Sequence, residues 1–139
     1  MGLDVGSKTI GVAVSDELQI SAHGITTIKW NENDMSSADE ALKDIISQYE
    51  IQKIVVGLPK NMNGTIGDRG RISQIYANRL EKKFQLKVHL IDERLTTMTA
   101  EKTLIEGNMS RKKRKNVIDK TAAIIILQQY LQNPQQTED

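Results

Sequence analysis

The feature that most constrains this chain is a carboxylate inside an otherwise apolar N-terminal segment. Residues 2–6, which include Asp4, are typical of a short buried strand, and residues 9–15 predict a second strand. Gly6, Ser7 and Lys8 between them predict a hairpin turn. A charge in a central strand costs several kcal/mol to desolvate unless a partner offsets it. The rest of the chain must therefore supply a partner for Asp4, either as side chains or as a bound metal.

Composition excludes several kinds of site. The chain has 139 residues, which suits one domain with a continuous core. It has no cysteine and only two histidines, which excludes disulfides and disfavours zinc. The sequence contains no run of about 18 apolar residues, so no membrane-spanning helix is expected. The first residues do not resemble a signal peptide. We expect a single-domain cytoplasmic protein that does not bind membranes, with residues 134–139 as a polar tail and oxygen ligands for any metal.

Charge is distributed unevenly, although the net charge is only +1. Residues 30–50 contain six acids and one base, whereas residues 110–120 contain six bases and one acid. A run of like charges is often a solvated loop. Its position just before Asp119 nevertheless favours contact with a nucleic-acid backbone. With one Phe, one Trp and three Tyr, the chain is not expected to rely on base stacking.

Hydrophobic periodicity predicts the element order βββ-α-β-α-β-α-α. After the first two strands, further strands are expected at residues 20–28, 53–58 and 88–91. Helices are expected at residues 37–49, where Ser37 and Glu40 would form a capping box, and at residues 72–84, 97–104 and 116–131. Helical crossovers should make the last two strands parallel to the first. The sequence therefore predicts an α/β fold with a mixed five-stranded sheet, three antiparallel strands followed by two parallel ones, and helices on both faces.

Three acids from distant segments can converge on this sheet. Asp4 lies in the first strand, Glu93 just after the fifth, and Asp119 in the first turn expected for the last helix, on its core-facing stripe. Ligands usually bind beyond the carboxyl ends of parallel strands. Asp92 and Glu93 are adjacent, so an extended backbone directs them to opposite faces and only one can join Asp4.

Such a carboxylate cluster suits Mg²⁺ or Mn²⁺. Two ions about 4 Å apart would activate a water molecule and stabilise the leaving oxygen of a phosphodiester. Each acid alone also has an ordinary explanation: Asp4 as a hydrogen-bonded strand acid, Asp119 as an acid favoured at a helix N-terminus, and Glu93 as the partner of Arg94. Together with the basic run, the three acids favour a metal site with two ions.

Four segments carry a resemblance to a known family: GLDVGSKTIGVAVSD at residues 2–16, VGLPKNMNGT at 56–65, DERLTT at 92–97 and IDKTAA at 118–123. In this order they resemble the motifs of the bacterial YqgF-type family, whose members are described as pre-16S rRNA nucleases and earlier as Holliday junction resolvases. The resemblance implies an RNase H-like fold in which Asp4, Glu93 and Asp119 are the catalytic, metal-binding triad.

Candidate contacts with nucleic acid are basic and amide side chains near this site. They are Lys8 in the hairpin turn, Lys60, Asn61, Asn63 and Thr65 in the loop after the fourth strand, Arg94, and the run Arg111, Lys112, Lys113, Arg114 and Lys115. The loop residues are equally typical of a turn. The resemblance favours contact with substrate.

Three classes of function remain open at this point. The first is a metal-dependent endonuclease on structured nucleic acid, with the 5′ region of pre-16S rRNA as the favoured substrate. A Holliday junction resolvase on branched DNA would use the same chemistry but would need a dimer, so a monomer and a homodimer both stay open. The second class is a phosphotransferase, which would have a similar first hairpin but would need two such domains. The third class is a non-cleaving nucleic-acid-binding factor in transcription or ribosome assembly.

Overall fold

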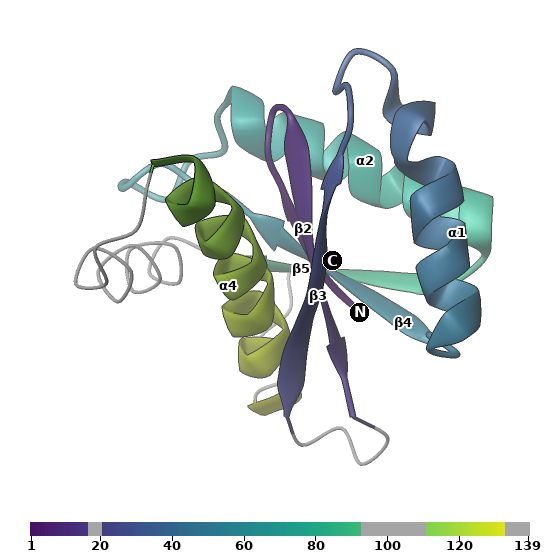
Figure 1. Cartoon of the computed structure of the whole chain (residues 1–139). Coiled ribbons are helices and arrows are strands. Elements are labelled where there is room, and N and C mark those ends of the chain that lie inside the picture. Colours follow the sequence, from purple (N-terminus) through teal and green to yellow (C-terminus); the bar gives the residue numbers. More distant parts are fainter. Residues whose placement is uncertain (17–20, 93–110, 133–139) are drawn as a thin grey trace.

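The computed structural model describes residues 1–16, 21–92 and 111–132, with side chains described in the first two ranges and again from Thr121. Five strands form one sheet in the order β3-β2-β1-β4-β5 (Figure 1). They are β1 (Gly2–Val5), β2 (Thr9–Ser15), β3 (Ala22–Lys29), β4 (Lys53–Leu58) and β5 (Lys87–Asp92). β1, β2 and β3 pair antiparallel, whereas β1, β4 and β5 pair parallel. The predicted mixed sheet is confirmed.

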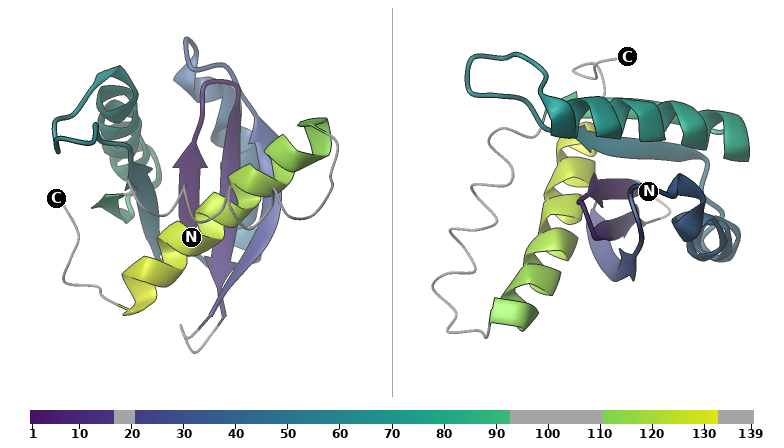
Figure 2. Two further views of the ribbon diagram at one scale, coloured as in Figure 1. Left: turned by 90° about the vertical axis from the view of Figure 1, so that its left-hand side faces the viewer. Right: turned by 90° about the horizontal axis from the view of Figure 1, so that it is seen from above.

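Helices cover both faces of this sheet, as Figure 2 shows. They are the short 3₁₀ helix η1 (Met35–Ala38), α1 (Asp39–Gln48), α2 (Asp68–Phe84) and α4 (Arg111–Gln132). On one face, Leu42 of α1 and Leu80 of α2 join a core that includes Leu3 of β1. On the other face, Ile126 of α4 packs in a second core with Val55 of β4. The two-sided covering of the sheet was predicted correctly.

The apolar run in β4 follows from this arrangement. Ile54 and Val56 belong to the core under α1 and α2, whereas Val55 belongs to the core under α4. Successive side chains of a strand point to opposite faces, so a strand covered on both sides is apolar throughout. The position of β4 beside β1 places the central carboxylate strand between two covered neighbours.

The last helix is longer than the sequence pattern predicted. The basic run was expected to be a loop before a helix at 116–131, but α4 begins at Arg111. Arginine and lysine are good helix formers, and no glycine or proline interrupts residues 111–132, so the helix extends through the run. Asp119 is therefore the ninth residue of α4, in its third turn (111 to 119), and its expected place in the first turn was wrong.

The predicted capping box at Ser37 and Glu40 is also wrong. The hydroxyl Oγ of Ser37 accepts a hydrogen bond from the backbone N–H of Asn31 (2.9 Å) and donates to the carbonyl of the same residue (3.3 Å). Asp34 caps the preceding 3₁₀ turn by accepting from the N–H of Ser36. The N–H of Asp39, the first residue of α1, donates to the carbonyl of Ser36. The 3₁₀ turn thus supplies an acceptor that a side-chain cap would otherwise provide.

The remaining boundaries agree closely with the sequence pattern. β3 begins at Ala22, where residues 20–28 were expected, and residue 20 lies outside the described part of the chain. α2 begins at Asp68, four residues before the expected start. The short helix expected at residues 97–104 lies wholly outside the described residues. In the ranges that the structure describes, no helix combines the length and hydropathy needed to span a membrane.

Candidate functional site

Asp4 faces α4 from the middle of the sheet. Its neighbours Leu3 and Val5 point into the core on the opposite face, under α1 and α2. A Cβ atom added at Gly2 would lie 2.7 Å from the Cβ of Leu127 in α4, so Gly2 points toward α4. Strand alternation puts Asp4, two residues later, on the same face as Gly2. The carboxylate is half-buried.

Asp4 lies between two glycine positions. Gly11 is directly opposite Asp4 in the pairing of β1 with β2. On the other side, Leu3 pairs with Val56 of β4, so the residue level with Asp4 is Gly57. Glycine weakens a strand interior and often marks a place where a ligand or another backbone approaches closely. At the level of Asp4, the two adjacent strands therefore present backbone without a side chain.

The hairpin that carries Asp4 is held in place by residues that sequence reasoning missed. The indole Nε1 of Trp30 donates to the carbonyl of Gly6 (2.9 Å), and the guanidinium of Arg69 donates to the carbonyl of Val5 (3.3 Å). Arg69 is itself held by an ion pair with Glu32. A Cβ at Gly6 would lie 2.9 Å from the carbonyl oxygen of Thr9, so this turn requires glycine. No spacing in the sequence connects Arg69 with Trp30 and Glu32, because Arg69 of α2 meets the residues after β3 only in the folded chain.

Asp92 is directed away from Asp4. Ile91 packs in the core under α4, and therefore shares the face of Asp4. Asp92 follows it on β5 and points to the opposite face. There its carboxylate lies 3.9 Å from the ammonium Nζ of Lys60. Asp92 is thus excluded as the acid that joins Asp4, while Glu93 and Arg94 lie outside the described residues.

The loop between β4 and α2 is organised by the residues that were predicted to contact nucleic acid. The amide of Asn61 donates to the hydroxyl of Thr65 (2.9 Å), and this hydroxyl donates to the amide oxygen of Asn63 (2.7 Å). The backbone N–H of Thr65 donates to the same oxygen (3.1 Å). These side chains therefore shape the loop. Lys8, at the tip of the β1–β2 hairpin, is exposed.

α4 positions Asp119 through the turns that follow it. Ala122, Ala123 and Ile126 are fully buried, as the predicted packing stripe required. Asp119 precedes Ala123 by four residues, about one helical turn. The side chains of residues 111–120, which include Asp119 and the basic run, are outside the described set.

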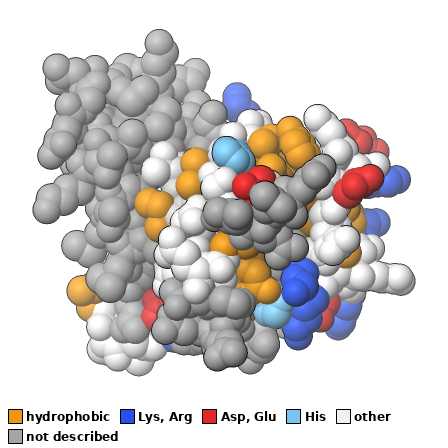
Figure 3. All heavy atoms as spheres, turned by 90° about the horizontal axis from the view of Figure 1, so that it is seen from below, with side chains coloured by type: hydrophobic (Ala, Val, Ile, Leu, Met, Phe, Trp, Pro, Cys, Tyr) orange, Lys and Arg blue, Asp and Glu red, His pale blue; other side chains and the backbone are white. Residues whose placement is uncertain are grey.

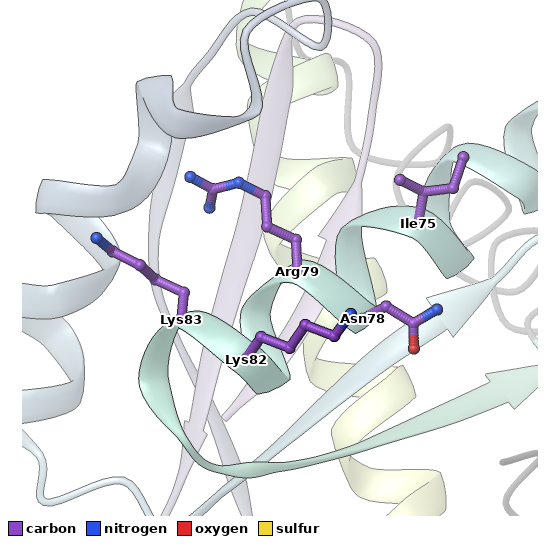
Figure 4. A pocket seen from close by; sticks show the side chains of 5 residues that line it. All are labelled: Ile75, Asn78, Arg79, Lys82 and Lys83. Carbon is purple, nitrogen blue, oxygen red and sulfur yellow. The ribbon is translucent and has the colours of Figure 1, made fainter.

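Two hollows lie elsewhere on the molecule. One of about 550 Å³ lies on α2 and is lined by Ile75, Asn78, Arg79, Lys82 and Lys83 (Figure 4). The guanidinium of Arg79 donates two hydrogen bonds of 2.7 Å to Asp39 of α1, and this pairing raises the pKa of Arg79. The hollow contains no acid, so it is not a candidate for the carboxylate chemistry.

The other hollow, of about 320 Å³, lies at the amino ends of β1 and β4, and its lining includes Met1, Tyr49 and Leu127. Figure 3 shows this end of the molecule, opposite the β1–β2 hairpin. Within the described part of the chain, no three acids or histidines form a group that could hold a metal. Asp4 is the member of the predicted triad whose side chain is described, whereas Glu93 and the side chain of Asp119 lie outside the described set.

Comparison with known proteins assigns the chain to a family. The family model described as "RuvX: Holliday junction resolvase" matches residues 1–133. The chain belongs to the RuvX family. It is 67% identical over 131 residues to a protein of Oceanobacillus iheyensis named "Putative pre-16S rRNA nuclease", covering 94% of this chain and 96% of that protein. A protein of the same name from Listeria monocytogenes is 58% identical, with 94% and 95% covered.

Solved structures agree with this family's fold. The structure of Thermus thermophilus RuvC in complex with a Holliday junction substrate matches with a TM-score of 0.60 at 12% identity, covering 98% of this chain and 96% of that one. A second structure of the same RuvC matches with a TM-score of 0.53 at 10% identity, covering 99% and 96%. The predicted RNase H-like fold, of the RuvC type, is confirmed.

Proposed function

We propose that this RuvX-family protein is a divalent-metal-dependent endonuclease that cuts structured RNA, with the 5′ end of pre-16S rRNA as its substrate. The observation that carries the proposal is the position of Asp4, a half-buried carboxylate on the central strand with glycine on both neighbouring strands. Glycine inside a strand often marks a place where a ligand approaches the backbone closely, which supports a ligand site at this carboxylate. The names of the relatives at 67% and 58% identity support RNA as the substrate.

Glu93 and Asp119 complete the proposed site. The direction of Asp92 away from Asp4 supports Glu93, the residue after β5, as the second acid of the site. The burial of Ala122 and Ala123 seats α4 on the face of Asp4, which supports Asp119 as the third acid. Because Asp119 lies in the third turn of α4, the helix dipole does not account for an acid there.

An all-carboxylate donor set fits Mg²⁺ or Mn²⁺, and no sulfur ligand is available because the chain lacks cysteine. Two such ions would activate water and stabilise the leaving oxygen of the phosphodiester. Asp4, Glu93 and Asp119 would hold the ions. Trp30 and Arg69 hold the backbone carbonyls of Gly6 and Val5, and so support the end of the strand that carries Asp4.

The basic run gives the nucleic acid a binding surface at the start of α4. Residues 111–115 are five cations in the first turns of a helix, where the dipole favours anions instead. This unfavourable placement is offset when a phosphate backbone binds there. Lys8 on the hairpin, with the exposed Asn61, Asn63 and Thr65 in the loop after β4, extends the surface, whereas Lys60 at the base of this loop is 11% exposed and paired with Asp92. We infer that the monomer is sufficient, since cutting one RNA strand needs one site.

A Holliday junction resolvase is the second candidate, because the family model bears that description and the fold matches a RuvC that binds a junction. Cutting two strands symmetrically would need a homodimer. Purified protein should therefore be incubated with Mg²⁺ and either precursor 16S rRNA or a four-way DNA junction. Cleavage of the RNA alone supports the proposal, whereas paired cuts in the junction by a dimer support the alternative.

The same assay tests the residues. Asp4→Asn, Glu93→Gln and Asp119→Asn should each abolish cleavage while leaving most of the RNA affinity, because phosphate contacts supply it. Asp92→Asn is the matched control and should retain most activity. Equal losses in Asp92→Asn and Glu93→Gln would mean that the wrong neighbour was assigned. Binding without cleavage in the wild type would favour a nucleic-acid-binding factor.

A further inference from the structure

The loop between β4 and α2 holds one apolar side chain in solvent. Met62 is 81% exposed, compared with 58% for Ile75 and 40% for Tyr49, the other exposed large hydrophobic residues in the described part of the chain. Met62 follows Asn61 in a turn closed by a hydrogen bond from the N–H of Gly64 to the carbonyl of Asn61 (2.8 Å). Nothing in such a turn requires an apolar residue. The turn itself therefore does not account for the exposed thioether.

This loop is built to keep its shape. The N–H of Asn61 donates to the carbonyl of Thr65 (2.8 Å), in addition to the side-chain bonds that join Asn61, Asn63 and Thr65. Gly64 adopts a φ of 87°, which other residues rarely reach. A Cβ at Gly70 would lie 2.7 Å from the carbonyl oxygen of Pro59, so α2 begins directly against the base of the loop. A loop held in this way has little backbone conformational entropy left to lose on binding.

The loop also lies at the end of the sheet where the parallel strands have their carboxyl ends, which is the end of the proposed site. It leaves β4 at its carboxyl end, and Lys60 at its base pairs with Asp92 at the carboxyl end of β5. β1 is parallel to β4, so Asp4 approaches the same edge. Figure 2 shows the loop projecting beyond this end of the sheet.

We infer that Met62 contacts the face of an unstacked base, and that the substrate is RNA with unpaired nucleotides beside a helix. This inference rests on the proposed function and specifies the substrate class. Apolar side chains, methionine among them, pack against the faces of bases in protein–DNA complexes, and an unstacked base has such a face exposed. The flexible thioether of methionine adapts to irregular surfaces and makes favourable contacts with aromatic rings. The neighbours of Met62 are amides and a cation, which suit nucleic acid, whereas docking of a protein would need a wider apolar patch.

The test compares Met62→Gln with Met62→Leu, and uses Ile75→Gln on α2 as a matched control. Affinity is measured in EDTA, which blocks metal-dependent cleavage, for an RNA hairpin with an unpaired 2-aminopurine next to the stem and for the fully paired stem. Met62→Gln should bind the first RNA about tenfold more weakly, or ~1.4 kcal/mol, and lose its fluorescence change. The paired stem should bind unchanged. Met62→Leu should retain the affinity for the first RNA, and Ile75→Gln should bind both RNAs with the affinity of the wild type.

Three results would overturn the inference: equal losses on both RNAs, no loss on either, or no binding of RNA by the wild type. In the second case a protein partner would remain as the ligand of the loop. Failure of the proposed function is a separate outcome. A wild type that never cleaves in Mg²⁺, yet shows the Met62-dependent preference for unpaired RNA, would retain the inference and remove the nuclease.

Discussion

Substituting Gly2 by alanine tests how α4 is seated on the strand that carries Asp4. The added Cβ would lie 2.7 Å from the Cβ of Leu127 and 3.0 Å from the carbonyl oxygen of Ala123. Ordinary contacts between carbon atoms need about 3.5–4.0 Å. The first contact is therefore too close by roughly 1 Å. Neither atom belongs to a flexible side-chain end, so α4 or β1 must move.

Overpacking of this kind costs about 1–3 kcal/mol. For a chain of this size, the melting temperature should fall by roughly 3–10 °C. Urea and thermal unfolding followed by circular dichroism measure this change. Gly24→Ala is the matched control, because Gly24 is exposed in β3 and has no positive φ. It should be neutral or slightly stabilising.

The same variant should affect activity more than its stability suggests. A shift of α4 relative to β1 would separate Asp119 from Asp4, and displacements of about 1 Å can reduce rates 10²-fold. Cleavage by folded Gly2→Ala protein should therefore fall by at least about tenfold. An unchanged melting temperature together with full activity would refute the reasoning, since α4 would not be packed on Gly2 as the structure has it.

Two other substitutions test the charges. Asp4→Asn should raise the melting temperature of metal-free protein, because like charges ~4 Å apart repel by about 4 kcal/mol at an effective dielectric of ~20. Mg²⁺ should then stabilise the wild type more than the variant, and a destabilised metal-free variant would make Asp4 a structural acceptor. Replacing all five cations of residues 111–115 by Gln should reduce the log–log salt slope of binding by about 2 to 3, because consecutive helical residues turn ~100° and about three can face one backbone. An unchanged slope would leave the run as a solvated helix end.

The sheet could be predicted from sequence because its signals are local. The apolar residues of β2 and the short apolar run of β4 each specify one strand, and Gly6, Ser7 and Lys8 specify the turn between β1 and β2. The start of α4 could not be read in the same way. The apolar periodicity begins only after residue 115, whereas the helix begins at Arg111, where lysine and arginine favour helix without any apolar stripe.

The candidate site also has one part that could be predicted from local sequence and another that could not. The position of Asp4 in a strand was evident, because a charge among apolar residues is a local signal. Its glycine neighbours Gly11 and Gly57 became visible only through the pairing of β1 with β2 and β4. The support from Trp30 and Arg69 likewise could not be read from a local pattern. Trp30 is 24 positions from Gly6, and Arg69 is 64 positions from Val5, the residues whose carbonyls accept their hydrogen bonds.

The central claim is that Asp4, Glu93 and Asp119 bind one metal centre. Calorimetric titration of Mn²⁺ into the wild type and into Asp4→Asn, Glu93→Gln and Asp119→Asn tests it most directly, with Asp92→Asn as the control. Each of the three substitutions should weaken Mn²⁺ binding strongly, because the ions lose a charged ligand. Asp92→Asn should bind as the wild type does. Wild-type affinity in Glu93→Gln or Asp119→Asn, or an equal loss in Asp92→Asn, would contradict the account.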